Sequence, residues 1–365
     1  MTGRICHKSY GRNLAKKNRV IFGNKSQQET AGKSVSRILL IAVVLLLNVS
    51  IATCAAQERP RSSMDGRIQQ AVNYLTGHFN SNVGLIYESE DAGTHWLKRV
   101  EYPNYQWKYD QTYWVYSDNL FAAYALLPWA PQIAHEINET IKRYNPPFSG
   151  KFEAVIGQPV GPDRQARDII VNETENFAVL IRIHDGLVSD PRYHFADAMI
   201  YEALTKYYTS RIGEAQEEVR QVAAMWNGTC MVDYGVKQTE LTPGNAPSDI
   251  GFCINFKLAL LLYGSEVTGV TLQNFDYLAD TLWKMQNNNG GITTLSTGNG
   301  EPIGSANTET TSLTLLVYNT ALIARLHTTV MDETNLDRGV LLAAAITTLL
   351  PVVYLSKRKI TGSRK

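Results

Sequence analysis

Four polar clusters in the sequence bring carboxylates to the start of apolar segments. They are SDN at 117–119, NETEN at 172–176, SDI at 248–250 and NTET at 307–310. Ser, Asp and Asn side chains accept hydrogen bonds from the free N–H groups of a first helical turn, so each cluster predicts the start of a helix. If these helix starts converge, the same carboxylates come within reach of one substrate.

Glycoside hydrolysis needs two carboxyl groups, one protonated and one ionised. The clusters offer such groups, and we take Asp118, Glu175, Asp249 and Glu309 as candidate catalytic residues. Glu173 stands beside them in the second cluster. The alternative interpretation is that all five carboxylates only cap helices or interact favourably with the positive ends of helix dipoles.

The segment 96–116 is rich in aromatic residues and leads into the first cluster. Aromatic rings can stack on the flat faces of sugars, with polar neighbours fixing the orientation of the ligand. The candidate substrate-binding residues are Trp107, Tyr109, Asp110, Trp114 and Asn119. The alternative is that the segment packs beneath the domain as an apolar plug.

Other chemistry has little support in the sequence. The histidines show no pair at metal-ligand spacing, and there is no Gly-rich phosphate loop, GxSxG or HExxH motif. We therefore predict neither a metal site nor a cofactor.

The elements that would position these groups are helices. Taking Asp118, Glu175, Asp249 and Glu309 as markers, the clusters lie 57, 74 and 60 residues apart, a loose repeat. Between the apolar segments, apolar residues recur at spacings of three and four, which predicts amphipathic helices. These cover Met64–Phe79, Pro131–Tyr144, Tyr193–Tyr208, Gly213–Met225 and Leu272–Met285. Alternating amphipathic outer helices and apolar inner helices predict an all-α fold, an α/α toroid built as a ring of helical hairpins.

Three connections between the predicted outer and inner helices are similar to one another. They are FNSNVGLIYES at 79–89, WNGTCMVDYGV at 226–236 and QNNNGGITTLST at 286–297. Each predicts a helix that ends at Asn or Gly, followed by a short extended piece and a return into an inner helix.

Two stretches resemble known families. The segment from Met285 to Tyr318 is similar to the unit of terpenoid-cyclase and prenyltransferase-like toroids. VGLIYESEDAG and YWVYSDNLFAAYAL resemble the openings of six-hairpin glycosidases and related sugar epimerases. The resemblance covers about residues 64–327 in architecture, and what it implies is a toroid fold more than a particular activity. The acidic DxDD and DDxxD motifs of the cyclases and prenylating enzymes are absent, which puts those activities in doubt.

Both ends of the chain combine basic residues with an apolar segment. Residues 1–37 carry nine Lys and Arg against one acid, and 38–56 is predicted to be a signal peptide or signal anchor. Residues 339–355 are apolar and precede a basic tail at 356–365, which favours a transmembrane helix over a buried core helix. We therefore predict a membrane protein whose domain, residues 58–335, lies outside the cytoplasm, with basic cytoplasmic segments at 1–37 and 356–365.

Charge, cysteines and sequons fit this topology. Residues 58–337 contain 20 basic and 33 acidic side chains, a net charge of −13 that argues against a nucleic-acid partner. Cys230 and Cys253 either form a disulfide or remain as two buried thiols. Asn138, Asn172 and Asn227 lie in N-glycosylation sequons.

Two functions follow as alternatives. The first is a membrane-anchored enzyme that acts on glycans as a glycoside hydrolase, lyase or epimerase. The second is a non-catalytic domain that binds a glycan or protein, or that serves as a structural element of the cell envelope.

Overall fold

The computed structural model describes residues 64–90, 109, 111–161, 165–186, 195–233 and 252–330, all within one compact unit of the chain. The basic segments 1–37 and 356–365, the apolar segments 38–56 and 339–355, and the site candidates Trp107, Asp110 and Asp249 lie outside these residues. Among the described residues, no helix has both the length and the apolar character needed to cross a bilayer.

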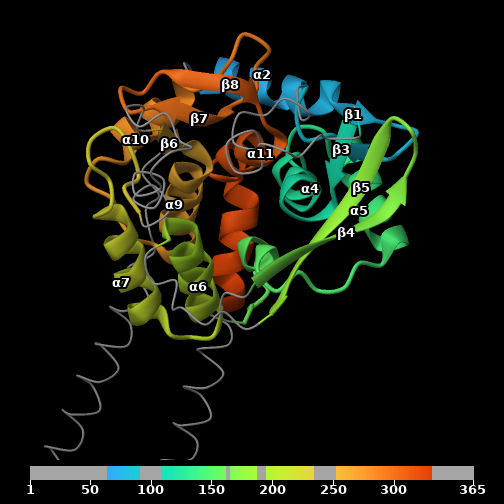
Figure 1. The fold of residues 1–365 in the computed structure, drawn as a ribbon. Coiled ribbons are helices and arrows are strands. Elements are labelled where there is room, and N and C mark those ends of the chain that lie inside the picture. Colours follow the sequence, from blue (N-terminus) through green and yellow to red (C-terminus); the bar gives the residue numbers. More distant parts are fainter. Residues whose placement is uncertain are drawn as a thin grey trace, which may run out of the picture. The chain divides into compact units, whose positions relative to one another are not determined.

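Four amphipathic helices lie on the outside of the unit (Figure 1). They are α2 (Met64–Gly77), α5 (Pro131–Tyr144), α7 (Ile212–Ala223) and α10 (Phe275–Trp283). Each buries one stripe and exposes the other, so the prediction of these helices from apolar spacing is confirmed. Pro131 occupies the first turn of α5, where its missing N–H costs nothing, and Asn145 ends the helix in the left-handed conformation.

Four further helices are buried at the centre. They are α4 (Leu120–Ala125), α6 (Ala196–Tyr208), α9 (Asn255–Thr268) and α11 (Thr308–Leu316), with residues 320–330 also helical. Helix α11 contacts α4 and α9, and α9 contacts α6; the 3₁₀ helix η3 (Phe152–Ile156) touches both α6 and α4. The prediction of α6 as an outer helix is wrong, because most of its side chains are buried.

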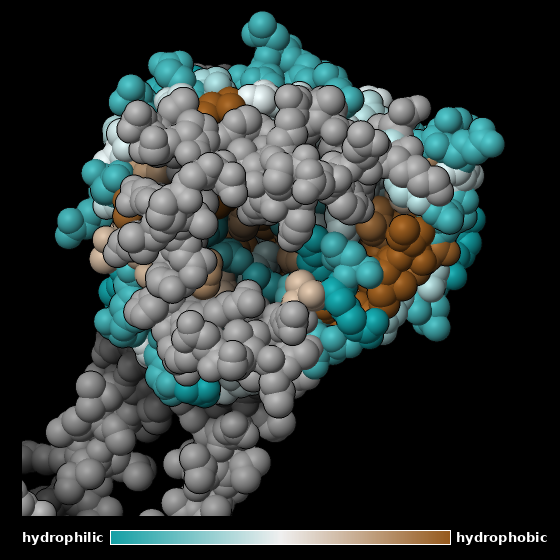
Figure 2. Space-filling model, viewed as in Figure 1, coloured by the Kyte–Doolittle hydropathy of each residue, from teal (hydrophilic) through white to brown (hydrophobic). Residues whose placement is uncertain are grey.

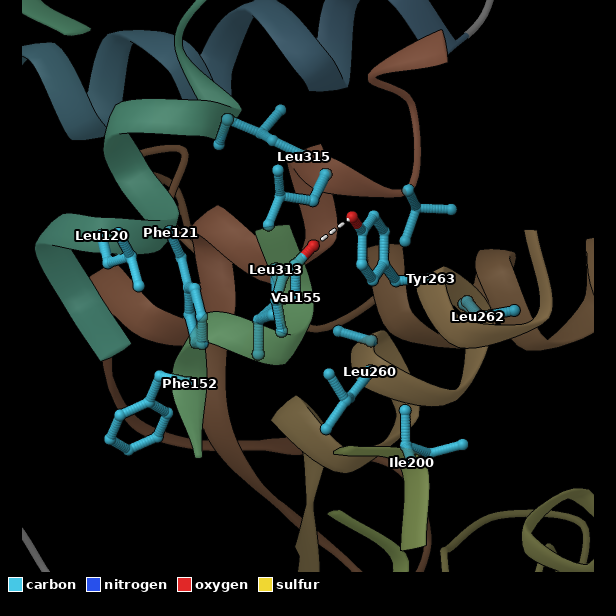
Figure 3. Close-up of a cluster of buried hydrophobic side chains, with 14 of the residues drawn as sticks. Leu120, Phe121, Phe152, Val155, Ile200, Leu260, Leu262, Tyr263, Leu313 and Leu315 are labelled. Carbon is cyan, nitrogen blue, oxygen red and sulfur yellow. Dashed lines mark hydrogen bonds between the residues drawn. The ribbon is translucent and has the colours of Figure 1, made fainter. Parts of the chain in front are cut away.

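The space between these central helices is filled by apolar side chains. Figure 3 shows Phe121, Leu260 and Leu313 pointing toward one another from α4, α9 and α11. The Tyr263 hydroxyl donates a 2.6 Å hydrogen bond to the Val155 carbonyl of η3, so its polar end is satisfied in the core. This part of the unit is a packed apolar core.

Three small sheets overturn the prediction of an all-α toroid. The first pairs β1 (Phe79–Asn80) with β2 (Leu85–Ile86). The second has the order β3-β5-β4, and the third the order β6-β7-β8. Their strands are β3 (Gln111–Trp114), β4 (Gln165–Glu173), β5 (Phe177–Gly186), β6 (Phe252–Ile254), β7 (Thr293–Thr297) and β8 (Pro302–Ala306). The unit is therefore a mixed helix and sheet structure.

The hairpin of β4 and β5 replaces the inner helix that the NETEN cluster predicts. Its strands pair antiparallel, and β3 pairs parallel to β5 with Trp114 opposite Leu180. Two properties of the sequence explain the difference: β-branched residues are frequent in 169–183, and residues such as Val179, Ile181 and Ile183 recur with period two. The predicted helix start is the turn of the hairpin.

The three similar connections each contain an antiparallel pairing. Phe79 pairs with Ile86, Trp226 with Met231, and Gln286 with Ile292. This confirms the predicted short extended pieces. In the second connection, the Cys230 and Cys253 sulfurs are bonded with 5.2 Å between the two Cα atoms, which attaches the connection to β6.

Candidate functional site

The extended piece after β2 is held between two central helices. On one side, the Asn119 amide accepts from Ile86 N–H (2.8 Å) and donates to the Ile86 carbonyl (2.9 Å). On the other side, at the start of α11, Thr308 donates its N–H to the Glu88 carbonyl (2.9 Å) and its hydroxyl to the Tyr87 carbonyl (2.7 Å). These bonds bring the starts of α4 and α11 to the same short piece of backbone, which carries Glu88.

Two carboxyl groups therefore approach one another at this junction. Every α11 residue except Glu309 is buried, and Glu309 is half-buried at the start of the helix. Burial raises the pKa of Glu309 to about 7; Arg182 and Lys151 oppose this rise, while Asp197 and Glu88 add to it. The Thr308 N–H bond to the Glu88 carbonyl joins the backbone next to Glu309 to the residue that carries the second carboxyl group.

Glu88 is itself buried and held in a fixed orientation. Glu88 is only 7% exposed, and its Oε2 accepts a 3.0 Å hydrogen bond from the Trp114 indole N–H. Its backbone N–H donates a 2.8 Å hydrogen bond to the carbonyl of Thr112 in β3, so the extended piece lies beside this strand. A carboxyl group positioned this way can act on a bound molecule without first having to be ordered.

Arg182 joins this junction from β5. Its guanidinium lies 4.7 Å from the centre of the Trp114 ring and forms two hydrogen bonds with Asp168, of 2.7 and 2.9 Å. Burial lowers the pKa of Arg182, but the bonds with Asp168 outweigh this effect and raise it. The charges of Glu309 and Glu88 add to the rise.

A second group of charges lies at the starts of α6 and α9. Lys257 contacts Asp233 closely and lies 3.8 Å from Asp197, which in turn pairs with Lys151 at 2.8 Å. Asp233 also accepts a 3.0 Å hydrogen bond from the first N–H of α6, at Ala196. Burial raises the pKa of Asp197, but Lys151 and Lys257 outweigh it and lower the pKa well below its ordinary value. The ion pairs among these four side chains hold the two helix starts together.

Asp118 is positioned by an unusual backbone conformation. Ser117, in the π-helix η2 (Val115–Asn119), has φ 62° and ψ −80°, close to the strained γ-turn. Its hydroxyl donates a 3.0 Å hydrogen bond to Asp118 Oδ1, and Asp118 is only 2% exposed. Neither η2 nor α4 has a side-chain cap. The carboxylate therefore enters the interior next to Asn119, without capping α4.

Figure 2 shows a hollow containing hydrophilic residues on the face where Figure 1 places α11 between α9 and α4. A hollow lined by hydrophilic residues is where a ligand site is expected.

The structure places the remaining candidates in different surroundings. Glu175 is exposed in the β4–β5 turn, away from any helix start, which corrects its predicted position. Glu173 is exposed at the end of β4 and accepts from the Tyr109 hydroxyl. Tyr109 and Trp114 are 8% and 7% exposed, so these rings are mostly covered. Asn119 is fully buried and bonds only backbone groups in its described contacts, which corresponds to a supporting role.

The two exposed sequons are at Asn172 on β4 and Asn227 before the disulfide. Asn138 is half-buried in α5, and Thr140 of its sequon is buried.

Sequence reasoning missed Glu88, Lys151, Arg182, Asp197, Asp233 and Lys257. For two of them a signal was available: Arg182 lies within the apolar run of β5, and Lys257 lies within the apolar helix α9. A single charge in such a run is rarely buried without a partner, so it marks a site where an opposite charge is expected. No comparable signal marks Glu88, whose position depends on the fold.

Among the described residues, no group of three His, Cys, Asp or Glu side chains is placed to hold a metal ion. Comparisons with models of protein families, with curated proteins and with solved structures found no match to this chain. The resemblance to carbohydrate-active families therefore stays a prediction from sequence motifs.

Proposed function

We propose that the protein is a carbohydrate-active hydrolase that cleaves glycosidic bonds by general acid–base catalysis, with Glu309 as the acid and Glu88 as its carboxylate partner. The observation that carries this proposal is the junction at the start of α11, where the Thr308 N–H and hydroxyl donate to two backbone carbonyls and bring Glu309 beside the piece that carries Glu88. Asn119, before α4, holds the same piece of backbone through its bonds to Ile86.

The electrostatics of the junction favour proton transfer near neutral pH. A general acid works best when its pKa lies close to the working pH. Burial brings the pKa of Glu309 to about 7, so both protonation states are populated there. Glycoside hydrolysis needs one protonated and one ionised carboxyl group flanking the scissile bond.

The surroundings favour a sugar as the substrate. The Trp114 ring borders the junction, and its N–H fixes Glu88. An aromatic ring beside a carboxyl group is a common feature of carbohydrate sites.

A glycan array and a hydrolysis screen of the full chain test the proposal. Glu309→Gln and Glu88→Gln keep the shape of each side chain and remove the titratable oxygen, so turnover should fall by roughly 10²–10⁴. Glu301→Gln and Glu175→Gln change exposed carboxylates of the same type and should leave turnover unchanged. Turnover that survives both site variants would refute the assignment. Binding without hydrolysis would support the non-catalytic alternative.

A further inference from the structure

Arg182 and Asp168 are held in a fixed arrangement on one face of the β3-β5-β4 sheet (Figure 1). They lie directly opposite each other, within the run 166–170 of β4 where the pairing with β5 has no bulge. Arg182 donates through Nε to Asp168 Oδ1 at 2.7 Å and through Nη2 to Oδ2 at 2.9 Å. Two bonds of this kind fix the plane of the guanidinium group as well as its position.

The guanidinium group lies over the ring of Trp114, which belongs to β3. Its central carbon is 4.7 Å from the ring centre, a distance typical of a cation–π contact. Leu180 of β5 stands opposite Trp114 and is buried with it in a small cluster separate from the main core. Arg182 and Leu180 therefore both help to set the orientation of the indole.

The indole N–H of Trp114 is the group that orients the carboxylate of Glu88. It donates a 3.0 Å hydrogen bond to Glu88 Oε2. An indole has one N–H, which points outward in the plane of the ring, so a tilt of the ring turns the donor away from Oε2. The orientation of this carboxylate thus depends on Arg182 through the ring that lies between them.

Stability alone does not account for the Arg182–Asp168 pair. The two side chains are 41% and 40% exposed, and exposed ion pairs contribute little to the free energy of unfolding. A second pair of the same type joins the same two strands, with Arg167 bonded to Asp185 at 2.8 and 2.7 Å. Arg167 lies opposite Ile183, whose side chain is in the main core, so it projects from the other face of the sheet.

We propose that Arg182 is a positioning residue: held by Asp168, it fixes the Trp114 indole and thereby keeps the Glu88 carboxylate in place at the start of α11. The consequence for catalysis rests on the function proposed above, because a carboxylate acts on a bound sugar only within a narrow range of orientations. The hydrogen bond between Trp114 and Glu88 can be tested without that function.

A double-variant cycle measures how far this hydrogen bond depends on Arg182. The full chain is studied in detergent by NMR with ¹⁵N-labelled tryptophan, and the indole signal that is lost in Trp114→Phe belongs to Trp114. Glu88→Gln replaces a charged acceptor by a neutral one, which should shift this signal clearly in the wild-type background. In the Arg182→Gln background the bond is already weakened, so the same Glu88 change should shift the signal little.

Arg167→Gln is the matched control, because it breaks the equivalent pair on the other face. In that background Glu88→Gln should shift the signal as it does in the wild type. Asp168→Asn should act like Arg182→Gln, since it weakens the fork that holds the guanidinium. A shift of wild-type size in the Arg182→Gln background would overturn the proposal. So would an equal reduction of the shift in the Arg167→Gln background, which would indicate a general loosening of the hairpin.

Turnover separates this proposal from the proposed function. If the wild type hydrolyses a glycan, Arg182→Gln should lower kcat by roughly 10–100-fold with little change in KM, and Arg167→Gln should leave both unchanged. Hydrolysis with an unchanged kcat in Arg182→Gln would refute the positioning role and leave the function intact. A wild-type chain without hydrolysis would refute the function, while the NMR cycle would still decide whether Arg182 holds Glu88 in place.

Discussion

Three consecutive residues, Ser117, Asp118 and Asn119, combine structural roles with a candidate catalytic carboxylate. Ser117 adopts a strained backbone conformation and donates to Asp118, and Asn119 turns back to bond the backbone of Ile86 and Trp114. The strain is tolerated because the bonds of Asn119 fix the chain on the C-terminal side of the turn. Asn119 was predicted to bind substrate, but its amide bonds the backbone and stabilises the fold.

Replacement of Asn119 should therefore destabilise the protein. Its amide makes three hydrogen bonds to backbone groups and is fully buried. Asn119→Ala leaves those groups without partners and should lower the free energy of unfolding by roughly 2–4 kcal/mol. Denaturant unfolding measures the change. Asn82→Ala, at an exposed position, should cost less than about 0.5 kcal/mol; equal losses in the two variants would contradict the supporting role.

Glu309 should make stability depend on pH in a predictable direction. Its pKa rises from an ordinary value of 4.5 to about 7 in the folded protein. Between these values the folded state holds a proton that the unfolded chain has released, so the free energy of unfolding falls as the pH rises. Glu309→Gln removes this dependence. Relative to wild type, the variant should gain up to about 3 kcal/mol between pH 4 and pH 8.

Thermal or denaturant unfolding at several pH values measures this gain, and Glu301→Gln is the control because its carboxylate is exposed. The Glu301 variant should follow the wild-type curve at every pH. If the Glu309 variant follows it too, the carboxyl group has an ordinary pKa and is not suited to be the acid proposed above.

At the scale of the element, apolar spacing predicted the helices well where one face is exposed. Helices α2, α5, α7 and α10 lie where apolar residues recur at spacings of three and four. This spacing places the apolar side chains on the one face of the helix that packs against the core. The same reasoning failed at 165–186. There the polar residues 172–176 resembled a helix start, and the period-two recurrence of Val179, Ile181 and Ile183, which indicates a strand, was overlooked.

The junction itself could be predicted only in part. Glu309 and Asp118 precede apolar helices, so their place at helix starts was visible in the sequence. Glu88 and Arg182 come from an extended piece and a strand, and their approach to Glu309 depends on the long-range bonds of Asn119 and Thr308. Contacts between residues so far apart in the chain leave no local pattern in the sequence.

The disulfide should stabilise the element that it attaches to β6. Cys230 and Cys253 are 23 positions apart, and closing a loop of that length in the unfolded chain corresponds to about 3 kcal/mol. Changing both to Ser should lower the free energy of unfolding by that order. A reducing agent should destabilise the wild type to a similar extent and leave the double variant unaffected. An unchanged unfolding curve for the double variant would refute this role.

At the scale of the whole molecule, the packed apolar centre and the paired charges at the helix starts have different roles. The apolar core between α4, α6, α9 and α11 fixes the helices, and paired charges gather at the starts of α6, α9 and α11. Buried ion pairs contribute little net stability but tolerate few arrangements, so they orient neighbouring groups. This arrangement explains how a stable fold can keep several carboxyl groups at one end.

The topology of the chain remains a prediction from its charge pattern. The apolar segment 339–355 is followed by basic residues at 357–359, and basic residues next to an apolar span are retained in the cytoplasm. The domain at 58–335 should then lie outside. Protease added to intact cells should digest the domain while an epitope fused after Lys365 survives, and permeabilised cells should lose both. A domain that resists the protease in intact cells, yet is cut after permeabilisation, would place it inside and contradict the prediction. It would also remove the glycans outside the cell from the candidate substrates.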